Sequence, residues 1–337
     1  MTKTGIPNLS LYELTSASKR IRDYVDKTPL FCWQKPPIRG QFANGNLYLK
    51  LEFLQRTGSF KARGAINNIL TKPAAQGSQG VTTVSAGNHA IAVAYAAKAL
   101  NVPAKVLMHK TASPFRIEKC KAYGAEVLLV DDINKAFALL EEIAANENRM
   151  IIHPFDSIRT LQGTGTLGLE IGEELTDLDA VVVAVGGGGL IGGVGSALKQ
   201  MYPSIKVIGV EPTGADGLTQ SLSQGKPLEN VTVNTIADSM GAPLHCERSF
   251  KVCQQVIDQM VLVKDDEMCD AMAFVYDNLK FALEPAGAAV VAAINGPLCG
   301  QLIGKKVAAI LCGSNIDEQA WATLLARGRQ NGFRHRT

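Results

Sequence analysis

One lysine stands in a setting that could change its chemistry. Lys61 follows Gly58, Ser59 and Phe60, and a turn glycine before a capping serine predicts that the lysine lies in the first turn of a helix. The macrodipole is positive at that end of a helix, and burial beside Phe60 would also disfavour a charge on the amine. A neutral amine is what a lysine needs to form a Schiff base. From this segment alone, an exposed lysine on an ordinary helix fits the residues equally well.

A run of glycines marks a possible phosphate site. The apolar run at 181–185 predicts a buried strand, and it leads directly into Gly186, Gly187, Gly188 and Gly189. Glycines between a strand and a helix leave backbone N–H groups exposed at the helix start, which suits a phosphate. A turn that only packs a helix against a strand is the plainer interpretation. Four successive glycines cost backbone entropy that packing alone rarely justifies, so we favour the phosphate site.

Two further segments place small polar residues at the ends of predicted strands. The strand at 81–84 is followed by a turn that opens an alanine-rich helix and suits a carboxylate: Ser85, Ala86, Gly87, Asn88 and His89. Late in the chain, the strand at 306–311 runs into Cys312, Gly313, Ser314 and Asn315. Doubly wound sheets bind ligands at the carboxyl ends of their strands, so both segments are candidate ligand sites.

Composition limits the kinds of partner. The 337 residues carry a net charge of +3 and the lysines and arginines are scattered, which argues against nucleic acid as a partner. No apolar run approaches membrane-spanning length, and residues 1–7 lack the apolar core of a secretory signal. Seven cysteines without a metal-binding spacing predict free thiols in a reducing compartment. We therefore expect a cytoplasmic protein with no membrane partner.

The order of predicted elements indicates an α/β fold. Between 80 and 156, strands alternate with helices as in a small parallel unit. These elements are strands 81–85, 104–108, 126–130 and 150–152 and helices 88–100, 113–123 and 134–147. A second series follows, with an irregular stretch at 214–243. Its elements are a helix through 167–175, the strand 181–185, a helix at 190–201, a strand at 206–210, helices near 265–282 and 285–294, and the strand 306–311. We predict two doubly wound parallel-sheet domains.

Five motifs together resemble the fold-type II pyridoxal-phosphate enzymes, and among them the threonine and serine dehydratases and the serine racemases. The motifs are Gly58 to Lys61, Ser85 to His89, Gly186 to Gly189, Glu284 to Gly287 and Cys312 to Asn315. The resemblance implies a tryptophan synthase β-like fold, pyridoxal 5'-phosphate as the cofactor, an amino acid as the substrate, and a homodimer or homotetramer. It also implies that a smaller substrate-binding domain (80–156) is inserted into a larger cofactor-binding domain (1–79 plus 157–337).

The resemblance implies a role for each motif residue. Lys61 would hold the cofactor as a Schiff base and then remove the Cα proton of the substrate. The glycine run would bind the phosphate, Asn88 the ring 3'-oxygen, and Cys312 would face the pyridine nitrogen. The full cofactor-binding set is Phe60, Lys61, Asn88, Gly186, Gly187, Gly188, Gly189, Glu284 and Cys312. The substrate-binding set is Ser85, Ala86, Gly87, Asn88 and His89. Asn88 could also be a helix N-cap, Cys312 an ordinary buried thiol and His89 a structural histidine.

Two departures from relatives favour a dehydratase over a racemase. Racemases of this group carry a second serine as the base on the opposite cofactor face, and Ala86 stands at that position. The run 153–156 (His-Pro-Phe-Asp) resembles the dehydratase pattern. Relatives often bind a cation near the position of Glu211, and the Ala215 carbonyl also aligns with their site. Gly217 stands at their aspartate position, although Asp216 is adjacent, so we assign no metal ligand.

We therefore predict a lyase that dehydrates and deaminates a β-hydroxy amino acid, such as L-threonine or L-serine, to a 2-oxo acid and ammonia. Alternatives within the group are a serine racemase, a hydroxyaspartate dehydratase and a phenylserine dehydratase. A cysteine-synthase-like β-replacement enzyme is less favoured, because Arg56–Gly58 and Asn88–His89 depart from its motifs. A non-catalytic nucleotide-binding module is a further alternative, because a doubly wound fold does not determine function. The length leaves no room for the regulatory domain of isoleucine-responsive threonine dehydratases, so we expect none.

Overall fold

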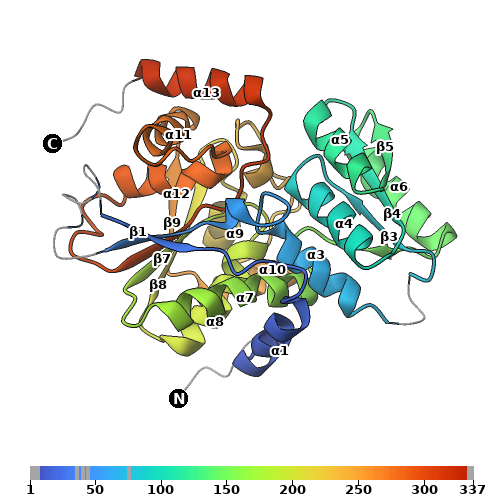
Figure 1. The fold of residues 1–337 in the computed structure, drawn as a ribbon, viewed down its shortest axis with the longest axis horizontal. Coiled ribbons are helices and arrows are strands. Elements are labelled where there is room, and N and C mark those ends of the chain that lie inside the picture. Colours follow the sequence, from blue (N-terminus) through green and yellow to red (C-terminus); the bar gives the residue numbers. More distant parts are fainter. Residues whose placement is uncertain (1–7, 35–37, 39–41, 43–45, 74–76, 332–337) are drawn as a thin grey trace.

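The computed structural model describes residues 8–34, 38, 42, 46–73 and 77–331, which form two sheets with helices around them (Figure 1). Residues 1–7, on which the cytoplasmic prediction partly rests, lie outside the described residues. Within the part that is described, no helix is both long and apolar enough to cross a membrane.

The larger sheet has the strand order β1-β2-β10-β7-β8-β9. Its strands are β1 (Leu30–Trp33), β2 (Leu47–Lys50), β7 (Ala180–Ala184), β8 (Lys206–Pro212), β9 (Gln259–Val263) and β10 (Val307–Ile310). Every neighbouring pair is parallel except β1 and β2, so an antiparallel strand is added at one edge. The central strands β7 and β10 are buried along their whole length, as expected where helices cover both faces of a sheet.

Helices cover the larger sheet on both faces (Figure 1). One group lies below the sheet in this view: α1 (Leu11–Ile21), α7 (Ile158–Glu174), α8 (Gly189–Met201) and α10 (Glu247–Val256). The other lies above it: α11 (Asp265–Leu279), α12 (Pro285–Asn295) and α13 (Glu318–Asn331). The connections contain α9 (Gly217–Gln224) and two single 3-10 turns, η1 (Glu52–Leu54) and η2 (Asp238–Met240).

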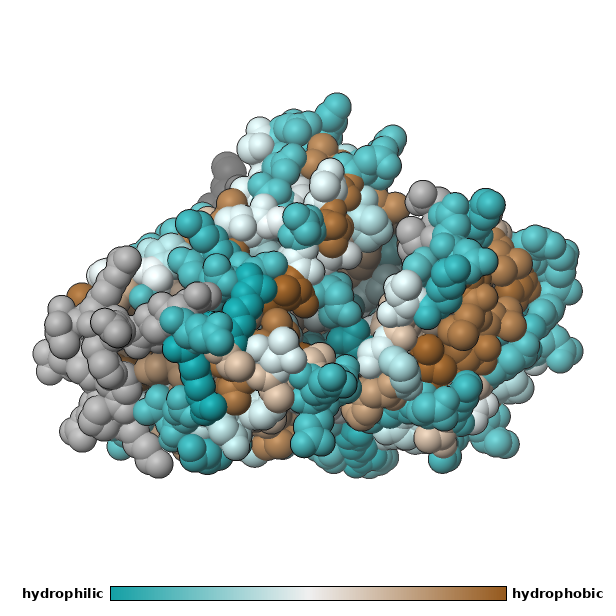
Figure 2. Space-filling model, turned by 90° about the horizontal axis from the view of Figure 1, so that it is seen from above, coloured by the Kyte–Doolittle hydropathy of each residue, from teal (hydrophilic) through white to brown (hydrophobic). Residues whose placement is uncertain are grey.

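The smaller sheet is wholly parallel, with the order β5-β4-β3-β6. Its elements are β3 (Val81–Val84), β4 (Ala104–His109), β5 (Glu126–Val130), β6 (Met150–Ile151), α4 (Asn88–Ala99), α5 (Pro114–Ala122) and α6 (Ile133–Asn146). Alternate residues of β4 face opposite helices: Val106 and Met108 pack with α4 and α5, and Leu107 packs with α6. Apolar side chains also gather on the outer surface of this part of the molecule, at the right of Figure 2.

Helix α3 (Lys61–Leu70) joins the two parts. It packs against α4 on one side and α7 on the other, and Ala62 and Ile66 belong to the core of the smaller sheet. The lysine helix therefore belongs to the core of the smaller sheet and also packs against α7, although its residues were assigned to the larger domain. The domain boundaries at 79/80 and 156/157 stay a prediction.

Two element predictions were wrong in extent. Helix α7 begins at Ile158, after the N-cap Ser157, and not near 167. Its first half is rich in small residues because it packs closely against α3: a Cβ at Gly163 would lie 2.5 Å from the carbonyl oxygen of Arg63. The stretch at 214–243 is also less irregular than predicted, since it contains α9 and η2.

Candidate active site

Helix α3 begins at Lys61, as predicted, but the serine before it does not cap the helix. The N-cap is Phe60, and the buried hydroxyl of Ser59 has no hydrogen-bond partner among the described residues. Ser59 instead forms a single β-bridge with Gly313, because the loop runs beside the segment that follows β10. The turn glycine is confirmed: Gly58 has a φ of 76°, which glycine adopts without strain. The backbone of the loop, and not a side-chain cap, fixes Lys61.

The amine of Lys61 has the lowered pKa that its setting predicts. Burial lowers its pKa to about 8, while Cys312 and Glu284 act in the opposite direction. Nζ donates a hydrogen bond to the carbonyl oxygen of Pro154 at 2.9 Å and lies 5.1 Å from the centre of the Phe60 ring. Such an amine is partly neutral at mildly alkaline pH, and the neutral form is both the nucleophile and the base.

The glycine loop lies between β7 and α8 and lines a cavity together with Lys61. Gly188 has a φ of 85°, and α8 begins at the next residue. A Cβ at Gly187 would lie 2.2 Å from the ring of Phe155, so a larger residue does not fit there. The first amides of a helix have no carbonyl partner within the helix, which leaves them for a ligand. The loop therefore fits a phosphate group.

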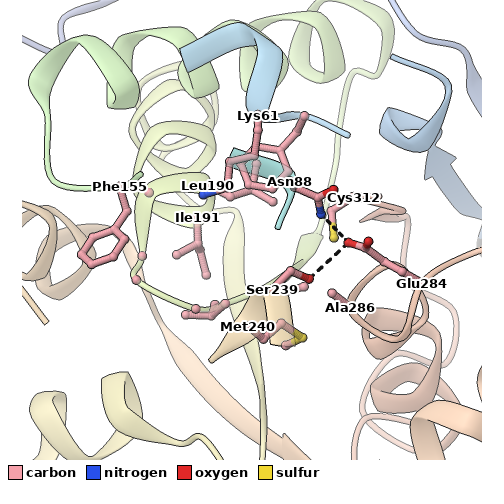
Figure 3. Close-up of a pocket in the computed structure, with 17 residues that line it drawn as sticks. Lys61, Asn88, Phe155, Leu190, Ile191, Ser239, Met240, Glu284, Ala286 and Cys312 are labelled. Atoms are coloured by element: carbon pink, nitrogen blue, oxygen red, sulfur yellow. Dashed lines mark hydrogen bonds between the residues drawn. The ribbon is translucent and has the colours of Figure 1, made fainter. Parts of the chain in front are cut away.

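Glu284 is the centre of a hydrogen-bond network in the same cavity, which has a volume of about 40 Å³ (Figure 3). Its Oε1 accepts hydrogen bonds from Asn88 Nδ2 at 2.6 Å and from Ser239 Oγ at 3.2 Å. Asn88 Oδ1 in turn accepts from Asn315 Nδ2 at 2.6 Å. Asn88 does not cap its helix, because the N-cap is Gly87. The second carboxylate oxygen of Glu284 is buried without a hydrogen-bond partner in the described chain, so it can accept one from a ligand.

Cys312 lines this cavity too and keeps its proton at neutral pH. Burial raises the pKa of its thiol, and Glu284 raises it further. The cavity thus combines backbone amides, a carboxylate whose Oε2 accepts no hydrogen bond from the described residues, a neutral thiol and the Lys61 amine. Pyridoxal phosphate presents a phosphate, a polar ring and an aldehyde, so the groups present fit this cofactor. The atom that each residue would contact stays a prediction.

A second cavity, of about 340 Å³, adjoins the first. The two share five lining residues: Lys61, Asn88, Phe155, Gly187 and Ser239. The whole predicted substrate turn lines the larger cavity: Ser85, Ala86, Gly87, Asn88 and His89. The turn therefore lies beside Lys61, as the substrate prediction requires.

His89 has a structural contact as well as a place in the larger cavity. Its Nε2 lies 2.9 Å from the carbonyl oxygen of Ile152, and because a carbonyl only accepts, Nε2 carries the hydrogen. Burial lowers the pKa of His89 to about 3, and the charge of Lys61 adds to the shift. The ring is therefore neutral, and its hydrogen bond anchors the turn to the segment after β6.

Sequence reasoning missed most of the apolar lining of the larger cavity. Phe137 comes from α6, and Val233 and Leu244 come from the long connection after α9. These residues belong to no motif, and each is an ordinary apolar residue in its own segment. Asp238 and Ser239 were also missed, although a polar pair directly before Met240 was a possible signal.

The carboxylate of Glu211 is hydrogen-bonded to the first turn of α9. It accepts hydrogen bonds from the backbone amides of Leu218 at 2.9 Å and Thr219 at 2.8 Å, and from the Thr219 hydroxyl at 2.7 Å. Burial raises the pKa of Glu211 to about 7. The carboxylate thus bonds the first turn of α9. In the described ranges, no group of three or more His, Cys, Asp or Glu residues is arranged to hold a metal ion.

Two mainly parallel sheets, a glycine loop between β7 and α8, and a lysine whose amine lines the same cavity define the class of protein. The model of the pyridoxal-phosphate dependent enzymes matches residues 21–313, so the chain belongs to this family. It is 44% identical to the phenylserine dehydratase of Ralstonia pickettii over 96% of this chain and 98% of that protein. It is 36% identical to the L-threonine ammonia-lyase of Thermotoga maritima, over 95% and 79% of the two chains. The structure of maize serine racemase is similar, with a TM-score of 0.86, 33% identity and coverage of 96% and 99%.

These similarities confirm the predicted family, fold class and cofactor. The chain is a pyridoxal-phosphate-dependent lyase of the dehydratase and ammonia-lyase group, which carries out β-elimination on hydroxy amino acids.

Proposed function

We propose that this enzyme prefers a β-hydroxy amino acid whose β-carbon carries an aromatic ring, and that it releases the corresponding 2-oxo acid and ammonia. The larger cavity carries this proposal, because apolar side chains line it within reach of Lys61: Phe137, Phe155, Val233, Pro243 and Leu244. L-threonine and L-serine, the substrates first expected, would place only a methyl group or a hydrogen there.

Magnitudes favour the aromatic substrate. Full burial of a phenyl ring contributes roughly 1.5–3 kcal/mol, against about 0.8 kcal/mol for one methyl-sized group. A difference of about 1.4 kcal/mol corresponds to roughly tenfold in binding. The name of the relative from Ralstonia pickettii supports the same substrate class. The threonine ammonia-lyase from Thermotoga maritima supports threonine as the second candidate.

The residues divide the work of the elimination. Pyridoxal phosphate supplies the electron sink that makes the Cα–H bond acidic. Lys61 would hold the cofactor through its amine, and the freed Nζ would take the Cα proton of the substrate. The amides of the glycine loop hold the phosphate, and the turn at 85–89 orients the substrate carboxylate. The thiol of Cys312 is neutral and would leave the ring nitrogen without a charged partner, which favours departure of the β-hydroxyl over longer-lived side reactions.

Ala86 favours elimination over racemisation. Lys61 would serve one face of the bound cofactor, and a racemase needs an acid on the other face. Ala86 lines the larger cavity, and its side chain can neither give nor take a proton. We therefore propose that racemisation is slow compared with release of the 2-oxo acid.

A substrate panel tests the proposal. Purified enzyme is supplied with serine, threonine, 3-hydroxyaspartate and 3-phenylserine, each as separate stereoisomers, with no added nucleophile. The expected result is 2-oxo acid release with the highest kcat/KM for one phenylserine isomer. A cysteine-synthase-like enzyme would release none without a nucleophile. Equal or higher kcat/KM for serine or threonine would refute the aromatic preference.

Assembly and location follow from the resemblance and the composition alone. We propose a cytoplasmic homodimer or homotetramer. Light scattering on the eluting holoenzyme should give two or four times the chain mass of 35.9 kDa. A monomer at working concentration would contradict the proposed assembly.

A further inference from the structure

Arg116, in the smaller-sheet part, contacts residues that line both cavities: Ala86 and Asp238 in the larger one and Glu284 in the smaller one. Arg116 lies in the first turn of α5 and is buried. Its Nε donates to the carbonyl oxygen of Asn315 at 2.9 Å, and Nη1 donates to the carbonyl oxygen of Ala86 at 3.5 Å. Nη1 also donates to the Asp238 carboxylate, and Nη2 donates to its other oxygen at 3.3 Å.

Each partner belongs to a different part of the site. Ala86 is in the substrate turn, and Asp238 precedes Ser239, which lines both cavities. Asn315 holds Asn88 through the 2.6 Å hydrogen bond between their side chains. One guanidinium therefore joins three segments that are far apart in the sequence. Its planar, forked geometry suits this task in a way that an ammonium group does not.

Neighbouring contacts from α5 reinforce this junction. Lys119 Nζ donates to Asn315 Oδ1 at 2.7 Å, one helical turn after Arg116. Ser113 Oγ donates to Asp317 Oδ2 at 3.3 Å. The start of α5 is thus bonded repeatedly to the chain segment that follows Cys312.

We propose that Arg116 is a positioning residue for the β-elimination, which fixes the substrate turn against η2 and the Cys312 segment so that both cavities keep their shape around Lys61. This inference rests on the proposed function for its kinetic consequences, but not for its structural ones.

The charge of Arg116 has a second consequence inside the site. Three carboxylates face it: Asp238, Asp317 and Glu284, whose Oε2 lies 3.9 Å from Nη2. Burial raises the pKa of Glu284, Arg116 lowers it, and Asp238 raises it again. Glu284 in turn raises the pKa of Lys61. Without the guanidinium, Glu284 would bind a proton more readily, and the pKa of Lys61 would fall.

Four variants of the holoenzyme test the proposal. Arg116→Met removes the charge and the fork, whereas Arg116→Lys keeps the charge and loses the fork. Asp238→Asn changes only the carboxylate partner, whose side chain is more than half exposed. Lys121→Met is the matched control, since this exposed lysine of the same helix pairs with Glu118, also on the surface. Hydrogen exchange at 85–89 and 113–117 is measured beside KM, kcat and the pH profile.

Arg116→Met should raise KM by roughly tenfold or more, the scale of one charge-assisted hydrogen bond, with a smaller loss in kcat. Hydrogen exchange at 85–89 should accelerate, and the rising limb of kcat/KM against pH should move to lower pH. Arg116→Lys should keep the pH profile of the wild type but still raise KM. Asp238→Asn should raise KM less than Arg116→Met does. Lys121→Met should match the wild type.

Unchanged KM and unchanged exchange at 85–89 in both Arg116→Met and Asp238→Asn would overturn the proposal. A salt bridge that only stabilises the fold would give a different result. The variants would then refold more slowly and lose kcat by the same factor as KM rises, while hydrogen exchange at 85–89 stayed unaltered. Hydrogen exchange is independent of substrate identity, so a wrong substrate class would not affect this readout.

Discussion

The two cavities that meet at Lys61 are built from different kinds of residue. The smaller one is lined by the glycine loop, by apolar side chains, and by Glu284, Asn88 and Cys312, and a hydrogen bond joins Glu284 to Asn88. The larger one is lined mainly by ordinary apolar side chains, with the substrate turn at 85–89 as part of its wall. Backbone geometry defines the first cavity, and side-chain volume defines the second.

This difference separates chemistry from substrate choice. Groups that hold a phosphate or tune an amine need particular residue types, because a larger residue at Gly187 would collide with Phe155. Groups that hold an aromatic ring need only apolar volume, which several residue types can supply. Changes in the smaller cavity should therefore abolish, redirect or retune the reaction, and changes among the apolar side chains of the larger one should alter which substrate is used.

Lys61→Ala should have the largest effect, because Lys61 belongs to both cavities. Turnover should fall on the order of a thousandfold or more, the scale of a lost general base and covalent attachment point. Borohydride should no longer link cofactor to protein, which mass spectrometry of the reduced protein would show. Lys110→Ala, an exposed lysine paired with Asp131, is the control. Normal rates with a cofactor linkage at another lysine would disprove the assignment.

Ala86→Ser would add an acid and base to the wall of the larger cavity. Racemisation of unreacted serine should rise on the order of a hundredfold, because a positioned group of this kind contributes at least that much. Chiral analysis in deuterated water measures the effect in both proteins. If the wild type already racemises as fast as it eliminates, another residue or a water supplies the second proton, and the preference for elimination is wrong.

Phe137→Ala should change substrate choice and leave the chemistry intact. Loss of ring contacts should lower kcat/KM for phenylserine by roughly tenfold, since truncating a phenylalanine removes on the order of 1.5 kcal/mol or more of apolar contact. The value for threonine should change little. Phe31→Ala, another half-buried phenylalanine that lines neither cavity, is the control. Parallel losses for both substrates would show that Phe137 does not contact the aromatic ring.

Cys312→Asp should redirect the reaction by placing a carboxylate at the proposed ring-nitrogen position. A protonated ring nitrogen would stabilise negative charge for longer, so a transient long-wavelength absorbance band and side products should appear in stopped-flow spectra. Cys312→Ser stays neutral and should behave like the wild type. The position of Cys312 beside the ring nitrogen is wrong if the aspartate variant binds cofactor normally but keeps the wild-type spectrum and products.

Glu284→Gln should produce the smallest change, a shift in the pH profile. The negative charge of Glu284 raises the pKa of Lys61, so its removal lowers that pKa. The neutral base is then present at lower pH, and the rising limb of kcat/KM should move in the acid direction. Glu118→Gln on the surface of α5 should leave the limb in place. A shift toward alkaline pH would contradict the electrostatic coupling between Glu284 and Lys61.

Features set by local residue patterns were predicted correctly from the sequence. The strands of the smaller sheet and the glycine loop are examples, because apolar runs and successive glycines constrain the backbone directly. The capping role of Ser59 was predicted wrongly, because a tertiary bridge to Gly313 replaced the local hydrogen bond. Phe137 and Arg116 had no local signal, since their importance depends on which distant segments their helices meet.

A competition between two substrates tests the central claim most directly. The wild-type enzyme receives equal concentrations of phenylserine and threonine, each as its reactive stereoisomer, and the two 2-oxo acids are quantified early in the reaction. Their initial ratio equals the ratio of the two kcat/KM values. We predict that the aromatic product exceeds 2-oxobutyrate by about tenfold or more. A ratio of one or less would contradict the assignment of the larger cavity to an aromatic side chain.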